Sequence, residues 1–263
     1  MRRRSEGPGP SGVNNGSQPT RPGLGNSFKR HVGPTGFCPR QAQLLPAARG
    51  AWPRSGGLQC PANGLTVLDT HGGIGIIDIG SAAHDRIGQP GLVPPDQLDR
   101  LVERIHANSG GQSREATGAA ASNLDLYQVN CTFYDALGRD DNAYLLARAV
   151  QFFLPGIPQV YYVGLLAGQN DMALLKQSGV GRDINRHRFN NAEVSAALAK
   201  PVVQNLLALI RLRSHHAAFG GRFECLTGAH PEALTMRWTS GAALAELSVD
   251  FATLTHELHF TPV

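Results

Sequence analysis

The sequence predicts an α/β protein that ends in a separate antiparallel β-sheet, and two observations support this. Between residues 66 and 213, apolar runs typical of buried strands alternate with segments whose apolar residues repeat at a helical period. Beyond residue 221 the apolar period changes to two, which is typical of strands with one buried face. With 263 residues, the chain is long enough for one large or two modest domains.

The first 64 residues differ in composition from the rest of the chain. They contain 12 Gly and 9 Pro, and their nine Lys or Arg are set against one acid, Glu6. Such a segment cannot bury enough apolar surface to offset its ordering entropy, so we predict a disordered leader over 1–64. It is either a frameshifted or misjoined reading frame or a genuine flexible extension. The remaining chain has 15 basic and 19 acidic residues, so the basic charge does not indicate a nucleic-acid partner.

The cysteines and the apolar runs bear on location. The four cysteines, Cys38, Cys60, Cys131 and Cys225, form no C-x-x-C pair, so neither a metal site nor a disulfide framework is indicated. There is no run of 18 apolar residues, and no apolar h-region follows the Arg-rich start. We therefore expect a cytoplasmic protein without a membrane span or a secretory signal.

The first element lies within residues 66–81. A short apolar stretch there predicts a strand, and it is followed by Asp69, Thr70 and His71 and then by a glycine-rich loop. A buried strand that delivers polar groups at its C-terminal end is typical of a barrel-enzyme site. The glycines fail the G-x-G-x-x-G spacing of a dinucleotide turn. Their alternative role is structural, since glycine lets a loop approach packed backbone closely.

The following elements alternate in type. Pro94-Pro95-Asp96 starts a helix over 94–106, because proline suits the first turn and the acid complements the helix dipole. Residues 108–122 are rich in Gly, Ser and Ala and predict a long loop. An apolar face predicts a second helix over 142–154, ended by Pro155-Gly156. A short, fully buried strand is predicted within 156–164.

The last elements are a helix and a sheet. An apolar stripe predicts the closing helix over 200–213, and its cationic end suits the dipole. In the sheet, Leu234, Met236 and Trp238 face one way, and the residues from Ala243 to Phe251 repeat the alternation. His256 and His259 are three residues apart, so they do not form the H-E-x-x-H zinc motif.

Two polar stretches between these elements are candidates for binding. The first, Asn-Leu-Asp-Leu-Tyr-Gln-Val-Asn at 123–130, either binds a ligand or merely satisfies loop backbone. The second, Gly-Arg-Asp-Ile-Asn-Arg-His at 181–187, carries arginines whose planar donors suit sugar hydroxyls or phosphate oxygens. Its alternative role is an Arg–Asp pair that holds the loop, and the residues alone do not decide between the two.

Together with the Asp-Thr-His-Gly-Gly run, these two stretches closely resemble the sucrose phosphorylases, members of the α-amylase superfamily of (β/α)8 barrels. The resemblance extends from about residue 66 to residue 238. It implies that residues 65–218 hold about the seventh and eighth strands of such a barrel with their helices. It further implies that 219–263 begin the small antiparallel β domain that follows the barrel.

The resemblance also implies a reaction and a set of roles. Sucrose and phosphate give α-glucose 1-phosphate and fructose by a retaining double displacement, without a cofactor or a metal. The residues implied to contact substrate are His71, Asp125, Tyr127, Gln128 and Arg182. Arg186 and His187 are assigned only a supporting part.

One position departs from the family pattern, because Gly72 stands where the family has an aspartate, its third catalytic carboxylate. The nucleophile and the acid/base belong to earlier barrel strands. No catalytic residue is therefore intact, and we expect the chain to be inactive. The alternatives are a sibling phosphorylase of sucrose 6-phosphate or glucosylglycerate, a non-catalytic carbohydrate binder, and a basic interaction segment at 1–64. The oligomeric state stays open.

Overall fold

The computed structural model describes residues 64–75, 95–117, 128–227 and 230–262. Residues 1–63 of the leader predicted over 1–64 lie outside the described residues, as do Asp125 and Tyr127. All of the described residues belong to one unit of the chain.

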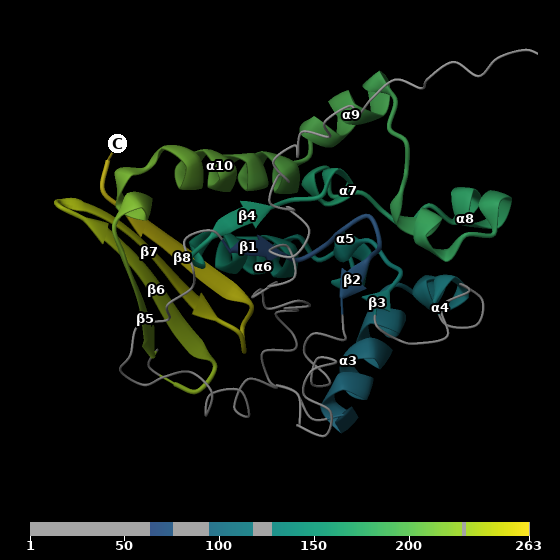
Figure 1. Cartoon of the computed structure of the whole chain (residues 1–263), viewed down its shortest axis with the longest axis horizontal. Helices are drawn as coiled ribbons and strands as arrows, with labels where there is room; N and C mark the ends of the chain where they lie inside the picture. The colour runs from purple at the N-terminus through teal and green to yellow at the C-terminus, as the bar shows by residue number, and fades with distance from the viewer. Residues whose placement is uncertain (1–63, 76–94, 118–127, 228–229, 263) are drawn as a thin grey trace, which may run out of the picture. The chain divides into compact units, whose positions relative to one another are not determined.

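Two short parallel strands form the barrel-like part. β1 (Leu65–Val67) pairs with β4 (Ile157–Gln159) in the register Leu65 to Ile157, and the two lie side by side in Figure 1. Two parallel strands with helices between them in the sequence confirm the predicted α/β class. The expectation of a fully buried strand within 156–164 was wrong, because Ile157 is 56% exposed and a helix already starts at residue 162. Among the described strands, only β1 pairs with β4.

The three predicted helices are present, and their observed ends differ from the predicted ones by one or two residues. They are α3 (Pro95–Asn108), α6 (Asp141–Phe153) and α10 (Pro201–His215). α6 begins where the side chain of Asp140 accepts hydrogen bonds from the backbone N–H groups of Asn142 and Ala143. Nearly all of its residues are buried, and it packs against α10 and against the C-terminal sheet. α6 is therefore the central element of the core.

Several short elements were not predicted. They are α4 (Gln112–Ala116), α5 (Phe133–Ala136), α7 (Tyr162–Leu165), α8 (Met172–Ser178), η4 (Gly181–Asn185), α9 (Asn191–Leu198) and η5 (Ala217–Gly220). The prediction of a loop over 108–122 was wrong for residues 112–116, which form α4, and residues 118–122 lie outside the described part. The buried side chains of Ser109 and Ser113 bond to each other and to His106, so polar residues hold this turn in place of an apolar stripe.

The C-terminal sheet is a four-stranded antiparallel meander. Its strands are β5 (Arg222–Thr227), β6 (Ala233–Ser240), β7 (Ala243–Asp250) and β8 (Thr255–Phe260), in that spatial order. Met236, Trp238 and Leu247 are buried on the inner face, which confirms the predicted alternation. The indole N–H of Trp238 donates to the carbonyl of Phe153 at 2.7 Å and so joins the sheet to the end of α6.

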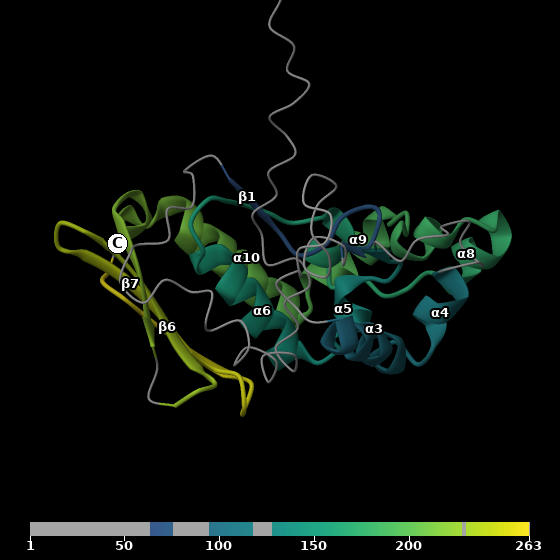
Figure 2. The ribbon, with the colours of Figure 1, turned by 60° about the horizontal axis from the view of Figure 1, so that its bottom comes forward.

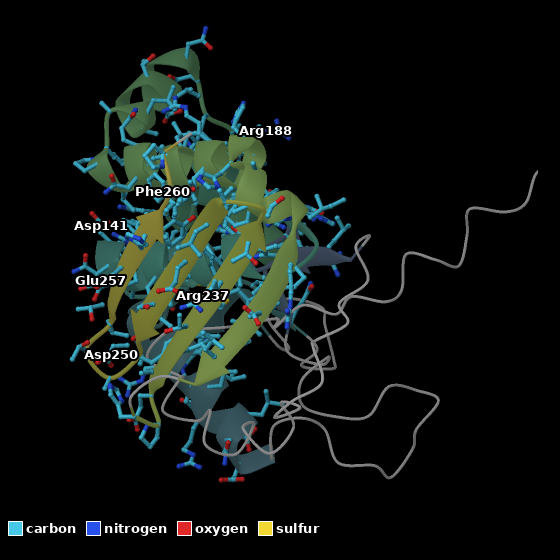
Figure 3. The ribbon with its side chains drawn as sticks, turned by 90° about the vertical axis from the view of Figure 1, so that its left-hand side faces the viewer. Asp141, Arg188, Arg237, Asp250, Glu257 and Phe260 are labelled. Atoms are coloured by element: carbon cyan, nitrogen blue, oxygen red, sulfur yellow. The ribbon has the colours of Figure 1, made fainter. Side chains whose placement is uncertain are left out.

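The two faces of this sheet differ in polarity. Figure 2 shows α6 and α10 on one side of the sheet, and Figure 3 shows the opposite face with Arg237 near its middle. On that outer face Arg237 pairs with Glu246 at 2.6 Å.

No single helix among the described residues has the length and apolar character to cross a bilayer. The helices α9 and α10, which are separated by a bend, meet the length and apolarity criteria only when they are taken together.

Candidate functional site

A tight turn follows β1 and presents the first candidate residues. The backbone N–H of Gly73 donates to the carbonyl of Thr70 at 3.0 Å, and the N–H of Thr70 donates to the carbonyl of Gly73 at 3.1 Å. This places His71, which is exposed, and Gly72 at the tip of the turn. Gly73 has φ +105°, and a Cβ there would lie 2.2 Å from the carbonyl oxygen of Val129, so only glycine fits.

A two-residue ribbon brings the second polar stretch against this turn. β2 (Ile74–Gly75) pairs antiparallel with β3 (Gln128–Val129), and Gly75 lies opposite Gln128. A Cβ built on Gly72 would lie 2.8 Å from Oε1 and 3.1 Å from Nε2 of Gln128. The half-buried Gln128 amide therefore occupies the space that a side chain at position 72 would need. Its Nε2 has no hydrogen-bond partner within the described part of the chain.

The third polar stretch, on and after η4, holds the same turn from another side. Nδ2 of Asn185 donates to the carbonyl of Thr70 at 2.9 Å, and Nε of Arg186 donates to the carbonyl of His71 at 3.1 Å. Arg182 is half-buried on η4. The Arg–Asp pair considered from the sequence exists, but it joins Arg186 to Asp183 at 3.2 Å.

The structure thus brings His71, Gly72 and Gln128 together and places Arg182 on the neighbouring helix. Asp125 and Tyr127 lie outside the described residues. The contribution of Asn185 was missed from the sequence. The sequence offered only its place in a polar loop, between Ile184 and Arg186, because its buried amide reaches a turn that lies 115 residues away in the sequence.

A buried polar network lies beneath the turn. Nη2 of Arg148 on α6 contacts Oδ1 of Asp69 at 2.9 Å, and both side chains are almost fully buried. Burial raises the pKa of the Asp69 carboxyl, and the adjacent Arg148 acts in the opposite direction. Nε and Nη2 of Arg148 also donate to the hydroxyl of Tyr144, which donates in turn to the carbonyl of Gly164. One helix therefore holds the segments that follow β1 and β4.

Gln151 connects the two strands directly. Its Nε2 donates to the carbonyls of Thr66 in β1 and Gln159 in β4, both at 2.8 Å. Nη1 of Arg148 donates to its Oε1 at 3.0 Å, so the network is continuous. The sequence signal for this network was three polar-tipped residues at i, i+4 and i+7 in an otherwise apolar helix, and it was not interpreted.

His187 closes the loop after η4. Its Nδ1 lies 2.6 Å from Oδ2 of Asp171, and its Nε2 lies 3.3 Å from Oε1 of Glu193. The hydrogen bond to Asp171 is the main cause that raises the pKa of His187, and burial opposes it. Asp171 caps α8 and Glu193 belongs to the capping box of α9, so one imidazole joins the starts of two helices.

Comparison with known proteins places this arrangement in a family. A sucrose phosphorylase from Agrobacterium vitis is 59% identical over 192 residues, which cover 73% of this chain and 38% of that protein. One from Bifidobacterium adolescentis is 54% identical over 190 residues, or 72% of this chain and 37% of that protein. The chain is homologous to the sucrose phosphorylases. No protein-family model matches it.

Related phosphorylases agree with this assignment. The crystal structure of sucrose 6F-phosphate phosphorylase from Thermoanaerobacter thermosaccharolyticum superposes with a TM-score of 0.67 at 32% identity, covering 85% of this chain and 44% of that one. A glucosylglycerol phosphorylase from Marinobacter adhaerens is 41% identical over 238 residues, 89% of this chain and 47% of that protein. The fold is thus part of an α-amylase-type barrel followed by an antiparallel sheet, as the sequence predicted. The chain spans less than half the length of these relatives.

The extent of the matches corrects the predicted limits of the resemblance. A match of 192 residues is longer than the stretch from 66 to 238, so the similarity to sucrose phosphorylases goes beyond it. A match over 89% of the chain is longer than residues 65–263, so the similarity to the Marinobacter protein includes part of the leader.

Proposed function

We propose that this chain carries the sugar-binding side of a sucrose phosphorylase site, and that Gly72 leaves that site without its third carboxylate. The observation that supports this best is the convergence of three separate stretches on one turn. β3 pairs beside the turn, and Asn185 and Arg186 bond to its carbonyls. The resemblance assigned substrate contacts to these same stretches.

In this proposal each group has a defined task. His71 and Arg182 hold the hydroxyl groups of the glucosyl unit, while Gln128, with Asp125 and Tyr127, faces the fructose or phosphate that leaves or enters. A carboxylate at position 72 would stabilise the positive charge that grows on the sugar in the transition state. Glycine has no such group, so the chain binds the glucosyl ligand but does not transfer it.

The proposed ligands are sucrose, phosphate, α-glucose 1-phosphate and fructose. Sucrose is favoured over the sibling substrates because two sucrose phosphorylases are 59% and 54% identical, against 41% for a glucosylglycerol phosphorylase and 39% for a sucrose 6F-phosphate phosphorylase, although a third sucrose phosphorylase is 37% identical. No cofactor is required by the proposed chemistry. We also place the protein in the cytoplasm, where thiols such as Cys131 and Cys225, which form no disulfide among the described residues, would stay reduced.

Calorimetric titration of sucrose and of glucose 1-phosphate into the full chain tests the proposal. We expect binding in the millimolar range or tighter, and no release of glucose 1-phosphate from sucrose and phosphate. His71→Ala removes an exposed imidazole at the turn and should weaken binding about tenfold, which corresponds to about 1.4 kcal/mol. His259→Ala, at an exposed position on β8, is the matched control and should leave binding unchanged. Equal affinities of all three proteins, or no binding at all, would contradict the proposal.

A further inference from the structure

Asn170 connects the loop before α8 to α4 and to the start of α5. It is half-buried. Its side-chain Oδ1 accepts a hydrogen bond from the backbone N–H of Thr132 at 2.9 Å, and its Nδ2 donates to Oε1 of Gln112 at 3.2 Å. Its backbone N–H donates to Oδ2 of Asp135 at 2.7 Å. Asparagine suits this position, because an amide both accepts and donates at one side-chain end.

The next residue, Asp171, connects the same loop to η4. Its backbone N–H donates to the carbonyl of Ile184 at 2.8 Å, and Ile184 is completely buried. Its Oδ2 lies 2.6 Å from Nδ1 of His187. Two consecutive residues therefore hold both the polar stretch that precedes α5 and the polar stretch on and after η4.

Both of these stretches reach the turn after β1. Thr132 closely follows β3, and on β3 the amide of Gln128 lies beside Gly72. Asn185, which donates to a carbonyl of the turn, comes directly after Ile184. The loop before α8 therefore determines how β3 and η4 lie relative to each other.

A purely local role does not account for these bonds. Asp171 also caps α8, because its side chain accepts from the backbone N–H of Leu174, and Thr132 caps α5. Those two caps need no partner outside their own helices. The partners of Asn170 lie 35 to 58 residues away in the sequence, so its bonds hold separate parts of the chain against each other.

We propose that Asn170 is a positioning residue for ligand binding at the turn. It acts through other residues and does not contact the ligand itself. Together with Asp171, it holds β3 and η4 at the separation that lets Gln128 and Arg182 reach one sucrose molecule. A displacement of about 1 Å is enough to impair such a site strongly. The inference rests on the proposed function, because it assigns both stretches to that ligand.

Calorimetric titration of sucrose into the full chain tests the proposal. Asn170→Ala should weaken sucrose binding about tenfold, because every side-chain bond of Asn170 is lost. Asn108→Ala is the matched control. Asn108 is also half-buried, and its Nδ2 donates to the carbonyl of Ala136 at 2.8 Å, so it holds the opposite end of α5. This variant should change the affinity less than about twofold, since that bond holds neither polar stretch.

A second readout needs no ligand and separates positioning from a loss of stability. In NMR spectra of the isotope-labelled full chain, Asn170→Ala should shift the side-chain amide resonances of Gln128 and Asn185, whereas Asn108→Ala should leave both unchanged. A variant that is less stable but still folded would shift neither. Asn170→Ser, which keeps a hydroxyl group at the position, should lose less affinity than Asn170→Ala, and it replaces that variant if the alanine form does not fold.

Equal effects of the two alanine variants on sucrose binding, or unchanged Gln128 and Asn185 resonances in Asn170→Ala, would overturn the proposal. If the unchanged chain does not bind sucrose, the resonances alone decide whether Asn170 positions the two stretches. A shift of both resonances would then count against the proposed function alone. Sucrose binding that Asn170→Ala leaves intact would count against this inference alone.

Discussion

The C-terminal sheet and the β1–β4 pair are both β-structures, but they are stabilised in different ways. Strands β6 and β7 pair over eight residues each, whereas β1 and β4 have only three residues each. In the sheet, backbone ladders and an alternating apolar face supply the cohesion. In the barrel-like pair, the side chains of Arg148 and Gln151 supply much of it. The loss of a single polar side chain should therefore be tolerated on the outer face of the sheet and be damaging at β1–β4.

The largest effect is expected from Arg148→Met. Removing the guanidinium leaves Asp69 as a buried carboxylate without its partner, which should cost about 3–5 kcal/mol in the free energy of unfolding. The matched variant in the sheet is Arg237→Met, whose ion pair with Glu246 is partly exposed and should cost less than about 1 kcal/mol. Urea unfolding followed by circular dichroism measures both.

The comparison of the sheet with the β1–β4 pair predicts that Arg148→Met lowers the free energy of unfolding more than Arg237→Met does. Adding Asp69→Asn to Arg148→Met should recover part of the loss, because the unpaired charge is then gone. Equal costs for the Arg148 and Arg237 variants would show that the buried network is not what holds the barrel-like pair.

A smaller effect is expected from Gln151→Leu. The substitution keeps the volume but leaves the buried carbonyls of Thr66 and Gln159 without the donor that they share, at a cost of about 1–3 kcal/mol. In the sheet, Thr235→Val removes only the side-chain contact with Ser248 and should cost under about 1 kcal/mol. Hydrogen exchange should show faster opening of β1 and β4 in the Gln151 variant alone.

The elements that the sequence predicted are those whose pattern is local. The alternation around Met236 and Trp238 identified the sheet, and the apolar face of α6 identified that helix. The spacing of Arg148 with Tyr144 and Gln151 indicated a polar network, but its partner Asp69 could not be derived, because Asp69 lies 79 residues away and an arginine in a helix usually faces solvent. α9 had a readable signal that was overlooked, since Asn190 and Glu193 form a capping box.

The candidate site shows the same division. The residue types in its three polar stretches predict a ligand site, and that role stays a prediction. Their contacts depend on the two-residue pairing of β2 with β3, which is too short to leave a periodic pattern. The position of Gln128 beside Gly72 was therefore visible only in the structure.

The smallest effect concerns pH and the loop closed by His187. Its folded-state pKa is raised, so its bonds to Asp171 and Glu193 contribute stability that is fully present below the unfolded-state pKa of about 6.5. This contribution is lost as the pH rises through the folded-state pKa, and it should stay below about 1 kcal/mol because the groups are partly exposed. Unfolding at pH 6 and pH 8 should show this loss, and His187→Gln should remove it. A slope of the opposite sign would contradict the assignment.

Steady-state kinetics of the Agrobacterium sucrose phosphorylase test the central claim most directly, with glycine placed at the position that aligns with Gly72. We expect an aspartate there in the native relative, and its exchange for glycine should lower kcat by about a thousandfold or more. KM should change only a few fold, because the carboxylate acts on charge that develops in the transition state while the residues that align with His71 and Arg182 still hold the sugar. A raised KM with an unchanged kcat would contradict the account, since position 72 would then contribute to binding alone.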